Sequence, residues 1–331
     1  MVLNRTSTGL IGRLAPSPTG ALHLGNARTF LLAWLSIRSR GGRLILRIED
    51  LDHPKVKHGT TQLLLEDLRW LGLNWDEGPD CGGPHAPYIQ SQRLDLYERA
   101  LAVLKSQNLV YPCVCSRNDV AAGQSAPHME DDGPRYNGNC RNRYSSFQSA
   151  KADLQGDRLP AWRFLVQSDR ETEFNDLFTG KQRQSVFETC GDFVVARHAS
   201  GAGYMLAVVV DDAAMNVTEV LRGDDLLSAT HRQLLIYKAL GLQPPEFVHV
   251  PLVVGTDGRR LAKRHGDTRL ATLRENGISS EKVIGLLGWW SGIAEFGEEI
   301  TAKMLISRFD LKKLPRTQAV VDSAVAKLLG L

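Results

Sequence analysis

The stretch SPTGALHLGNAR, residues 17–28, carries two glycines, a histidine and an asparagine between two apolar segments. The run TFLLAWLSIR that follows it repeats apolar side chains at helical spacing, which predicts a helix. Gly20 and Gly25 allow a ligand to approach the backbone closely, and the start of the next helix favours an anion. His23 can donate a hydrogen bond to a phosphate oxygen. The stretch is therefore a candidate phosphate-binding turn, although a glycine-bearing turn with a surface histidine explains it equally well.

Strands and helices alternate around this turn. We predict strands over residues 9–14 and 43–50, and a helix over residues 26–40. Two further helices are indicated by apolar residues at helical spacing, around residues 64–71 and 94–104. This alternation is typical of the α/β class, with a parallel sheet and crossover helices. Ligands of such sheets bind beyond the carboxyl ends of the strands, where SPTGALHLGN lies.

The character of the chain changes after residue 110. Residues 111 to about 150 are rich in Gly, Ser, Asn, Asp and Pro and hold a cluster of cysteines, which indicates an insertion. The α/β pattern resumes with FVVAR (193–197), MLAVVVDDA (205–213) and VTEVLRG (217–223), which we interpret as strands buried on both faces. From about residue 258 the chain is predicted to be helical and rich in lysine and arginine, as a separate unit.

Composition describes an ordinary globular protein. The chain has 331 residues, 43% hydrophobic and 23% charged, with a formal net charge of +3. No apolar run approaches the roughly 20 residues that span a bilayer, and the N-terminus shows no secretory signal. We therefore expect a cytoplasmic protein without a membrane partner. The weakly basic charge permits a nucleic-acid partner without requiring one.

Three of the five cysteines, Cys113, Cys115 and Cys140, lie within 28 residues of one another. An odd number of cysteines with this clustering favours a metal site in a reducing compartment over a disulfide framework. Zinc usually takes four ligands, and from spacing alone the fourth could be His128, Tyr136 or a water. Histidine is the commoner ligand of these. Buried free thiols are the alternative.

A second candidate site is the basic segment GRRLAKRHGD, residues 258–267. It follows the apolar run HVPLVVG and has glycines near both ends, which predicts a mobile loop at the end of a strand. Such a loop can clamp a triphosphate and stabilise charge as pyrophosphate leaves. A solvated basic surface is the usual explanation for a single charge run.

These segments together resemble a known family. HLGN (23–26) resembles the HIGH signature of class I aminoacyl-tRNA synthetases, and LAKRH (261–265) resembles their KMSKS loop. RLAPSPTGALHLGNAR, LRIEDLD, YMLAVVVDDAAMNVTEVLRGDDLL and HVPLVVGTDGRRLAKRHG are similar to the glutamyl branch, in its order and rough spacing. The resemblance covers most of residues 9–275. It implies a Rossmann-type sheet, ATP with Mg²⁺, and conversion of L-glutamate to glutamyl-adenylate.

The resemblance also implies roles for particular residues. The catalytic candidates are His23, Asn26 and Lys263, and those for ATP binding are His23, Gly25, Asn26 and Lys263. Glutamate would be bound by Arg13, Leu14, Ala15, Pro16, Ser17, Glu49, Tyr204 and Arg222. These types suit the chemistry, because guanidinium groups grip carboxylates and a glutamate can accept from an ammonium group. Structural roles are the alternative: Arg13 could pair with Glu49 across strands, and Tyr204 could belong to the core.

PRYNGNCR, residues 134–141, is similar to a tyrosine-then-cysteine element in a short relative of the glutamyl enzymes. This similarity implies a structural zinc ion held by Cys113, Cys115, Tyr136 and Cys140. The stretch 120–133 is longer than expected in such an element.

Few residues follow the basic loop, which we interpret as room for stem helices and none for an anticodon-binding domain. We divide the chain into two halves of the catalytic domain (1–110 and 191–255), a zinc-binding insertion (111–190), and a KMSKS-like loop with a helical stem-contact region (256–331). This organisation resembles the glutamyl-queuosine tRNA(Asp) synthetases. That family is expected to activate glutamate without tRNA and to transfer it to queuosine at the wobble position of tRNA(Asp). We expect a monomer.

Three alternatives share parts of this pattern. A shortened glutamyl-tRNA synthetase would charge the 3′ end of tRNA(Glu) with the same active-site residues. A non-catalytic RNA-binding paralogue would be expected to have lost those residues, which are intact here. Another HIGH-bearing nucleotidyltransferase would need neither the glutamate-pocket residues nor the cysteine cluster.

Overall fold

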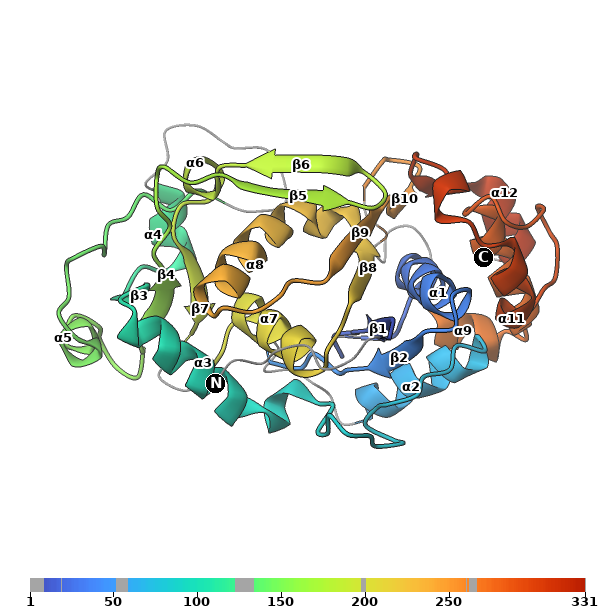
Figure 1. The fold of residues 1–331 in the computed structure, drawn as a ribbon. Helices are drawn as coiled ribbons and strands as arrows, with labels where there is room; N and C mark the ends of the chain where they lie inside the picture. The colour runs from blue at the N-terminus through green and yellow to red at the C-terminus, as the bar shows by residue number, and fades with distance from the viewer. Residues whose placement is uncertain are drawn as a thin grey trace.

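The strand–turn–helix unit predicted at the N-terminus is present in the computed structural model (Figure 1), which describes residues 9–18, 20–51, 59–122, 134–197, 201–259, 261 and 267–330. The strands β1 (Ile11–Leu14) and β2 (Arg43–Leu46) pair in parallel, and the helix α1 (Leu24–Arg38) connects them. All of β1 and most of α1 are buried, because α1 packs between this sheet and the C-terminal region. The predicted strand over 43–50 is shorter than expected and ends at Leu46.

A second parallel pair lies beside β1. The strands β8 (Glu219–Gly223) and β9 (Glu246–Val250) run parallel, with α8 (Leu227–Ala239) between them in sequence. Thr218 joins the two pairs, since its backbone N–H donates to the Ile11 carbonyl at 2.8 Å and its Oγ1 accepts from the Ile11 N–H at 2.8 Å. The parallel α/β sheet predicted from sequence is therefore confirmed, in the order β2, β1, β8, β9.

One predicted strand is wrong. The run 205–213 forms the helix α7 (Tyr204–Ala214), whose residues from Leu206 to Asp212 are all buried. A helix that is buried on every side has no polar face, so its sequence is as uniformly apolar as that of a buried strand. The predicted strand over 193–197 exists as β7 (Phe193–Ala196), but it pairs antiparallel with β4 (Ala161–Phe164) rather than joining the parallel sheet.

The central part of the chain forms a second, antiparallel layer, seen at the left of Figure 1. Its sheet has the order β3 (Val110–Cys113), β4, β7, and a hairpin of β5 (Thr172–Asp176) and β6 (Gly180–Gln184) extends from it across α8 and β9. The remaining helices of the first two hundred residues are α2 (Thr60–Trp70), α3 (Leu94–Ser106), α4 (Arg117–Ala122), α5 (Phe147–Ala152) and α6 (Val186–Thr189). Both helices expected from leucine spacing, α2 and α3, are thus present.

The C-terminal region is helical, as predicted, but it shares its core with α1. Its elements are α9 (Leu270–Glu275), α10 (Ser280–Trp289), α11 (Ala302–Leu305), α12 (Ser323–Leu329) and the strand β11 (Ala319–Val321). β11 pairs in parallel with β10 (Val253–Gly255), which precedes the basic segment. Inside the core, the guanidinium of Arg28 on α1 donates to the Pro251 carbonyl at 2.6 Å and to Ser291 Oγ at 3.2 Å. The expected separate unit is therefore packed against α1.

Short 3₁₀ turns complete the fold, at Gln90–Gln92, Asp224–Leu226, Ile306–Arg308 and Leu311–Lys313. Among the helices described, none has the length and apolar character that crossing a membrane requires.

Candidate active site

A cavity of about 590 Å³ opens at the carboxyl ends of β1 and β8, beside the first turns of α1 and α7. Most of the site residues predicted from sequence line it: Arg13, Ala15, Pro16, Ser17, His23, Gly25, Asn26, Glu49, Tyr204 and Arg222. Two predicted residues are not among them. Leu14 is fully buried in the hydrophobic core, so its side chain cannot contact a ligand in the cavity. Lys263 lies outside the described residues.

His23 caps the helix α1. The Gly25 N–H donates to its Nδ1 at 3.1 Å, so the proton of the neutral ring lies on Nε2. A Cβ at position 25 would lie 3.0 Å from His23 Cε1, which explains why glycine occupies this position. The helix begins two residues earlier than predicted because His23 serves as its cap. Its first turn contains no acidic residue. The N–H groups of Leu24 and Gly25 already donate to Thr268 and His23, so the N–H of Asn26 is the one in this turn that can receive an anion.

The chain that follows the basic segment returns to this turn. The Leu24 N–H donates to the Thr268 carbonyl at 3.1 Å, and the Leu270 N–H donates to the Leu22 carbonyl at 2.8 Å. Leu261, within the basic segment, lines the cavity itself. The basic segment predicted to clamp a triphosphate is therefore attached to the cavity at both of its described ends.

Arg13 and Glu49 do not form the cross-strand pair that sequence left open. Glu49 Oε1 accepts from Arg47 NH2 at 2.9 Å, while Arg13 Nε lies 3.8 Å from Asp212 Oδ1. Burial raises the pKa of Glu49, although Arg47 and Arg13 oppose this effect. Tyr204, at the start of α7, is only partly buried and faces the cavity, so it is not a core residue. Burial raises its pKa too.

Arg222 brings a buried positive charge to the cavity wall. Its Nε donates to His249 Nε2 at 3.0 Å, and its NH2 donates to Thr230 Oγ1 and Gln233 Oε1, both at 2.8 Å. Its NH1 is buried without a hydrogen-bond partner. Within the described parts of the chain no carboxylate forms an ion pair with Arg222, and burial lowers its pKa. A buried charge without a counter-ion fits a ligand that carries a carboxylate.

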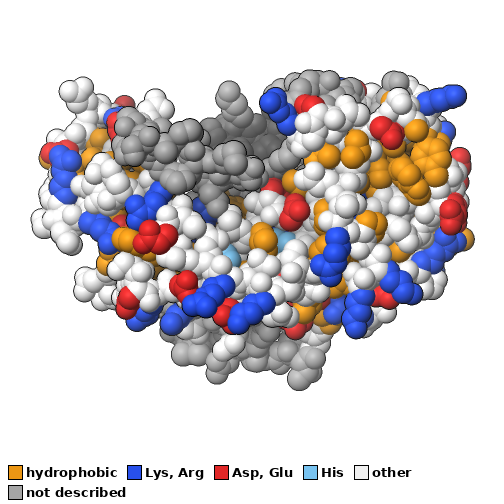
Figure 2. Space-filling view, turned by 90° about the horizontal axis from the view of Figure 1, so that it is seen from above, with side chains coloured by type: hydrophobic (Ala, Val, Ile, Leu, Met, Phe, Trp, Pro, Cys, Tyr) orange, Lys and Arg blue, Asp and Glu red, His pale blue; other side chains and the backbone are white. Residues whose placement is uncertain are grey.

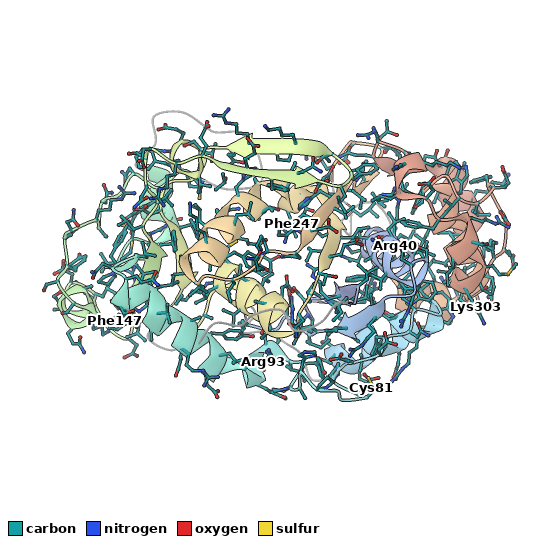
Figure 3. The ribbon with its side chains drawn as sticks, viewed as in Figure 1. Arg40, Cys81, Arg93, Phe147, Phe247 and Lys303 are labelled. Atoms are coloured by element: carbon teal, nitrogen blue, oxygen red, sulfur yellow. The ribbon has the colours of Figure 1, made fainter. Side chains whose placement is uncertain are left out.

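Behind the cavity lies a network of buried charges that the sequence interpretation missed. Arg47, wholly buried, contacts Asp212 Oδ1 at 2.7 Å and Asp211 Oδ2 at 3.7 Å. Asp211 also accepts from Arg93 Nε at 2.7 Å and from the Tyr97 hydroxyl at 2.8 Å (Arg93 is labelled in Figure 3). Burial alone would lower the pKa of Arg47, but the carboxylates around it raise that pKa well above its usual value. Two adjacent aspartates in an apolar run were the available signal, because such groups need buried partners.

The three clustered cysteines do come together. The Sγ atoms of Cys113, Cys115 and Cys140 all lie within 4.8 Å of one another. The Tyr136 hydroxyl lies 3.4 Å from Cys113 Sγ and 3.8 Å from Cys115 Sγ. Three sulfurs and one phenol oxygen that converge on one point are a donor set that fits zinc. The alternative ligand His128 falls outside the described residues.

The surroundings of this cluster favour the ionised form of one thiol, Cys140, whereas the hydrogen bond to Cys140 and burial raise the pKa of Cys113, and burial raises that of Cys115. The Arg163 Nε donates to Cys113 Sγ at 3.1 Å, and its guanidinium lies 3.8 Å from the centre of the Tyr136 ring. Hydrogen bonds, first of all from Cys113, lower the pKa of the Cys140 thiol. Thiolates are the form that binds metal, and a neighbouring arginine offsets part of their charge.

Comparison with known proteins agrees with this geometry. Residues 10–326 match the model of the family "tRNA synthetases class I (E and Q), catalytic domain". The chain belongs to this class I tRNA synthetase family. The class I catalytic domain expected from the ordered motifs is thereby confirmed.

Individual relatives show which members of the family this chain is similar to. The chain is 51% identical to a glutamyl-Q tRNA(Asp) synthetase of Symbiobacterium thermophilum, over 97% of this chain and 99% of that protein. It is 42% identical to glutamate–tRNA ligase 2 of Syntrophus aciditrophicus, over 94% of this chain but 63% of that protein. Among solved structures, a glutamate–tRNA synthetase of Elizabethkingia anophelis superposes with a TM-score of 0.81 at 30% identity, covering 97% of this class I chain and 70% of its own.

Proposed function

We propose that this chain is an ATP-dependent ligase that activates L-glutamate and transfers it to queuosine at the wobble position of tRNA(Asp). The observation that carries the proposal is the single cavity in which Arg13, Arg222, Glu49 and Tyr204 meet the first turn of α1. The cavity thus has groups for carboxylates, an ammonium and phosphate at its walls. The high identity to proteins named glutamyl-Q tRNA(Asp) synthetase over nearly their whole length supports the choice of acceptor.

In the first step, an oxygen of the glutamate α-carboxylate attacks the α-phosphorus of ATP. A new P–O bond forms as the bond to the bridging oxygen breaks, which gives glutamyl-adenylate and pyrophosphate. Arg13 and Arg222 hold the carboxylates and Glu49 accepts from the ammonium group, so this chain's contribution is positioning and charge stabilisation. His23 Nε2 and Asn26, at the start of α1, hold phosphate oxygens together with Lys263. The Mg²⁺ that accompanies ATP supplies further positive charge.

In the second step, a hydroxyl of queuosine attacks the glutamyl carbonyl carbon and loses its proton to solvent, and AMP leaves with the electrons of the C–O bond. On the face shown in Figure 2, basic and acidic side chains are interspersed, so charge alone does not mark a tRNA surface there. We assign tRNA contact to the helical region 256–331 and to the exposed Arg143 beside the cysteine cluster. Arg141, the other candidate there, already contacts the buried Asp192 through two nitrogens.

Transfer of labelled glutamate to purified tRNAs tests the acceptor. With ATP present, we expect label on tRNA(Asp) that carries queuosine, and none on tRNA(Asp) that lacks it or on tRNA(Glu). The position of the glutamyl ester on the tRNA is found by treating the 3′ end with periodate. The label that mild base hydrolysis releases is compared before and after that treatment. Label on the 3′ end of tRNA(Glu) would instead identify a short glutamyl-tRNA synthetase and contradict the proposal.

We also propose a structural zinc ion bound by Cys113, Cys115, Tyr136 and Cys140. Native mass spectrometry should find one zinc ion per chain, and Cys140→Ala should lose it, because three ligands leave an open tetrahedral site. Tyr136→Phe should release zinc to a chelator faster than the native chain, whereas His128→Gln should not. A folded native chain without zinc would contradict the site. If His128→Gln released zinc faster than the native chain and Tyr136→Phe did not, His128 would be the fourth ligand.

A further inference from the structure

Arg222 is held in place by side chains that belong to two different elements. His249 on β9 accepts from Arg222 Nε, and Thr230 and Gln233 on α8 accept from NH2. Among the described residues NH1 has no hydrogen-bond partner although it is buried, and Arg222 is one of the residues that line the cavity. The orientation of Arg222 therefore depends on His249 offering a lone pair at Nε2.

His249 is in turn oriented by Asp176 at the end of β5. The His249 Nδ1 lies 2.7 Å from Asp176 Oδ2, and both side chains are fully buried. Asp176 is itself fixed, because its Oδ1 accepts from the backbone N–H groups of Phe178 and Thr179, at 2.9 and 2.8 Å. The rings of Phe174 and Phe247 pack against the imidazole, with centroids 6.4 and 6.2 Å away (Phe247 is labelled in Figure 3).

The protonation of this pair follows from its partners. An ionised Asp176 accepts the Nδ1 proton, so the neutral ring keeps its lone pair on Nε2 and can accept from Arg222. Burial, with the nearby charge of Arg222, lowers the pKa of His249 to about 4, although Asp176 opposes this. Burial would raise the pKa of Asp176, but the bonds from His249 and the backbone lower it. A second proton on the His249 ring, at Nε2, would place one N–H donor opposite the N–H of the Arg222 guanidinium, and the hydrogen bond between them would be lost.

We propose that Asp176 and His249 are a positioning pair for Arg222, which they fix so that its free NH1 faces the substrate carboxylate. The inference rests on the proposed function, in which Arg222 binds glutamate; neither Asp176 nor His249 touches the substrate. It also assigns a role to the β5–β6 hairpin, which belongs to the segment between the two halves of the catalytic domain. Through Asp176, that hairpin sets the geometry of the glutamate pocket.

Two substitutions at His249 separate its two hydrogen bonds. In His249→Asn, the amide can reach Asp176 at the position of Nδ1 but nothing replaces Nε2. In His249→Gln, the amide oxygen can replace Nε2 as the acceptor for Arg222. We expect His249→Asn to raise the KM for glutamate about 10-fold, the size of one lost charge-assisted bond, with the KM for ATP changed less than about 2-fold. In His249→Gln, the KM for glutamate should lie close to the native value.

The measurement is ATP–pyrophosphate exchange by the full chain, with glutamate and ATP titrated separately. His231→Asn is the matched control, because His231 is also buried, also packs on Phe174 and bonds Thr172 Oγ1 at 2.7 Å rather than Arg222. It should keep the native KM for glutamate. An unchanged KM in His249→Asn, or equal rises for both substrates, would overturn the inference.

A spectroscopic measurement separates this inference from the proposed function. The ¹⁵N spectrum of the histidine rings should place the proton of His249 on Nδ1, and Asp176→Asn should perturb that signal while leaving the signal of His231 in place. A native His249 with its proton on Nε2 would overturn the pair, whether or not the chain activates glutamate. A native chain with the expected signal but without glutamate-dependent exchange would overturn the proposed function and retain the Asp176–His249–Arg222 contacts.

Discussion

Arg222→Met is expected to lower kcat/KM for glutamate in ATP–pyrophosphate exchange by about 10²- to 10³-fold. Removing one partner of a desolvated charge pair costs on the order of 2–5 kcal/mol, and each 1.4 kcal/mol is a factor of about ten. In the described residues Arg222 has no carboxylate partner, so its removal leaves no buried acid unpaired. The buried acceptors on His249, Thr230 and Gln233 lose their donor, which should lower the thermal midpoint, and the loss of activity in the folded protein should fall on the substrate.

Two further variants show whether the loss of activity in Arg222→Met is specific to the guanidinium of Arg222. Arg222→Lys keeps a charge but not the planar group that His249, Thr230 and Gln233 hold, so we expect activity between native and Arg222→Met. Arg308→Met removes a partly exposed arginine that pairs with Glu298 at 2.9 Å, and its activity should equal that of the native chain. Near-native kcat/KM in the folded Arg222→Met chain would exclude Arg222 from the glutamate site.

The site turn and the residues it brings together were predictable because local chemistry determines them. The end of β1 at Leu14, the glycines at 20 and 25 and the capping His23 are close in sequence and define the start of α1 locally. Hydrogen bonds to Thr268 and Leu270 then hold this turn from a distant part of the chain. The ordered motifs then placed Arg13, Glu49, Tyr204 and Arg222 in one pocket, and all four line the same cavity. What failed locally was Leu14, whose neighbours on β1 alternate between the core and the site in a way that a motif does not record.

The buried run 205–213 shows why element type can fail where burial is complete. As a strand, Asp211 and Asp212 would point to opposite faces; as part of α7, they contact Arg93 and Arg47 respectively. The apolar residues around the two aspartates are compatible with a buried strand and with a buried helix, so their periodicity does not distinguish the two. The arginines that bind the two aspartates in the helical structure lie more than a hundred positions away in the sequence, so a local pattern cannot show them.

The positioning pair was beyond sequence reasoning for the same physical reason. Asp176 and His249 are separated by 73 positions and sit in two short, ordinary strands. Their meeting depends on the hairpin lying across β9, which is a matter of packing between layers. Each residue alone resembles an ordinary polar residue in a strand, and only the Arg222 contact gives the pair a possible role.

Lys263→Ala is expected to slow pyrophosphate exchange on the order of 10²-fold, with little change in the KM for glutamate. Stabilising charge that develops as pyrophosphate leaves is worth this much when a preorganised donor is removed. Lys263 lies outside the described residues, but Leu261 lines the cavity and the backbone of Arg269 forms a β-bridge with that of His23, so the chain on both sides of Lys263 adjoins the turn at residues 17–28. The loss should therefore appear in kcat, because the proposed role of Lys263 is to stabilise the departing pyrophosphate and not to bind glutamate.

Two variants make that expectation specific to position 263. Lys263→Arg keeps the positive charge and should retain more activity than Lys263→Ala, since the developing negative charge is met by a cation in both the native and the arginine chain. Lys303→Ala removes an exposed lysine on α11, labelled in Figure 3, and should leave exchange unchanged. If Lys263→Ala exchanges at the native rate, the basic segment is a solvated surface and the charge at the departing pyrophosphate must come from His23, the first turn of α1 and the accompanying magnesium.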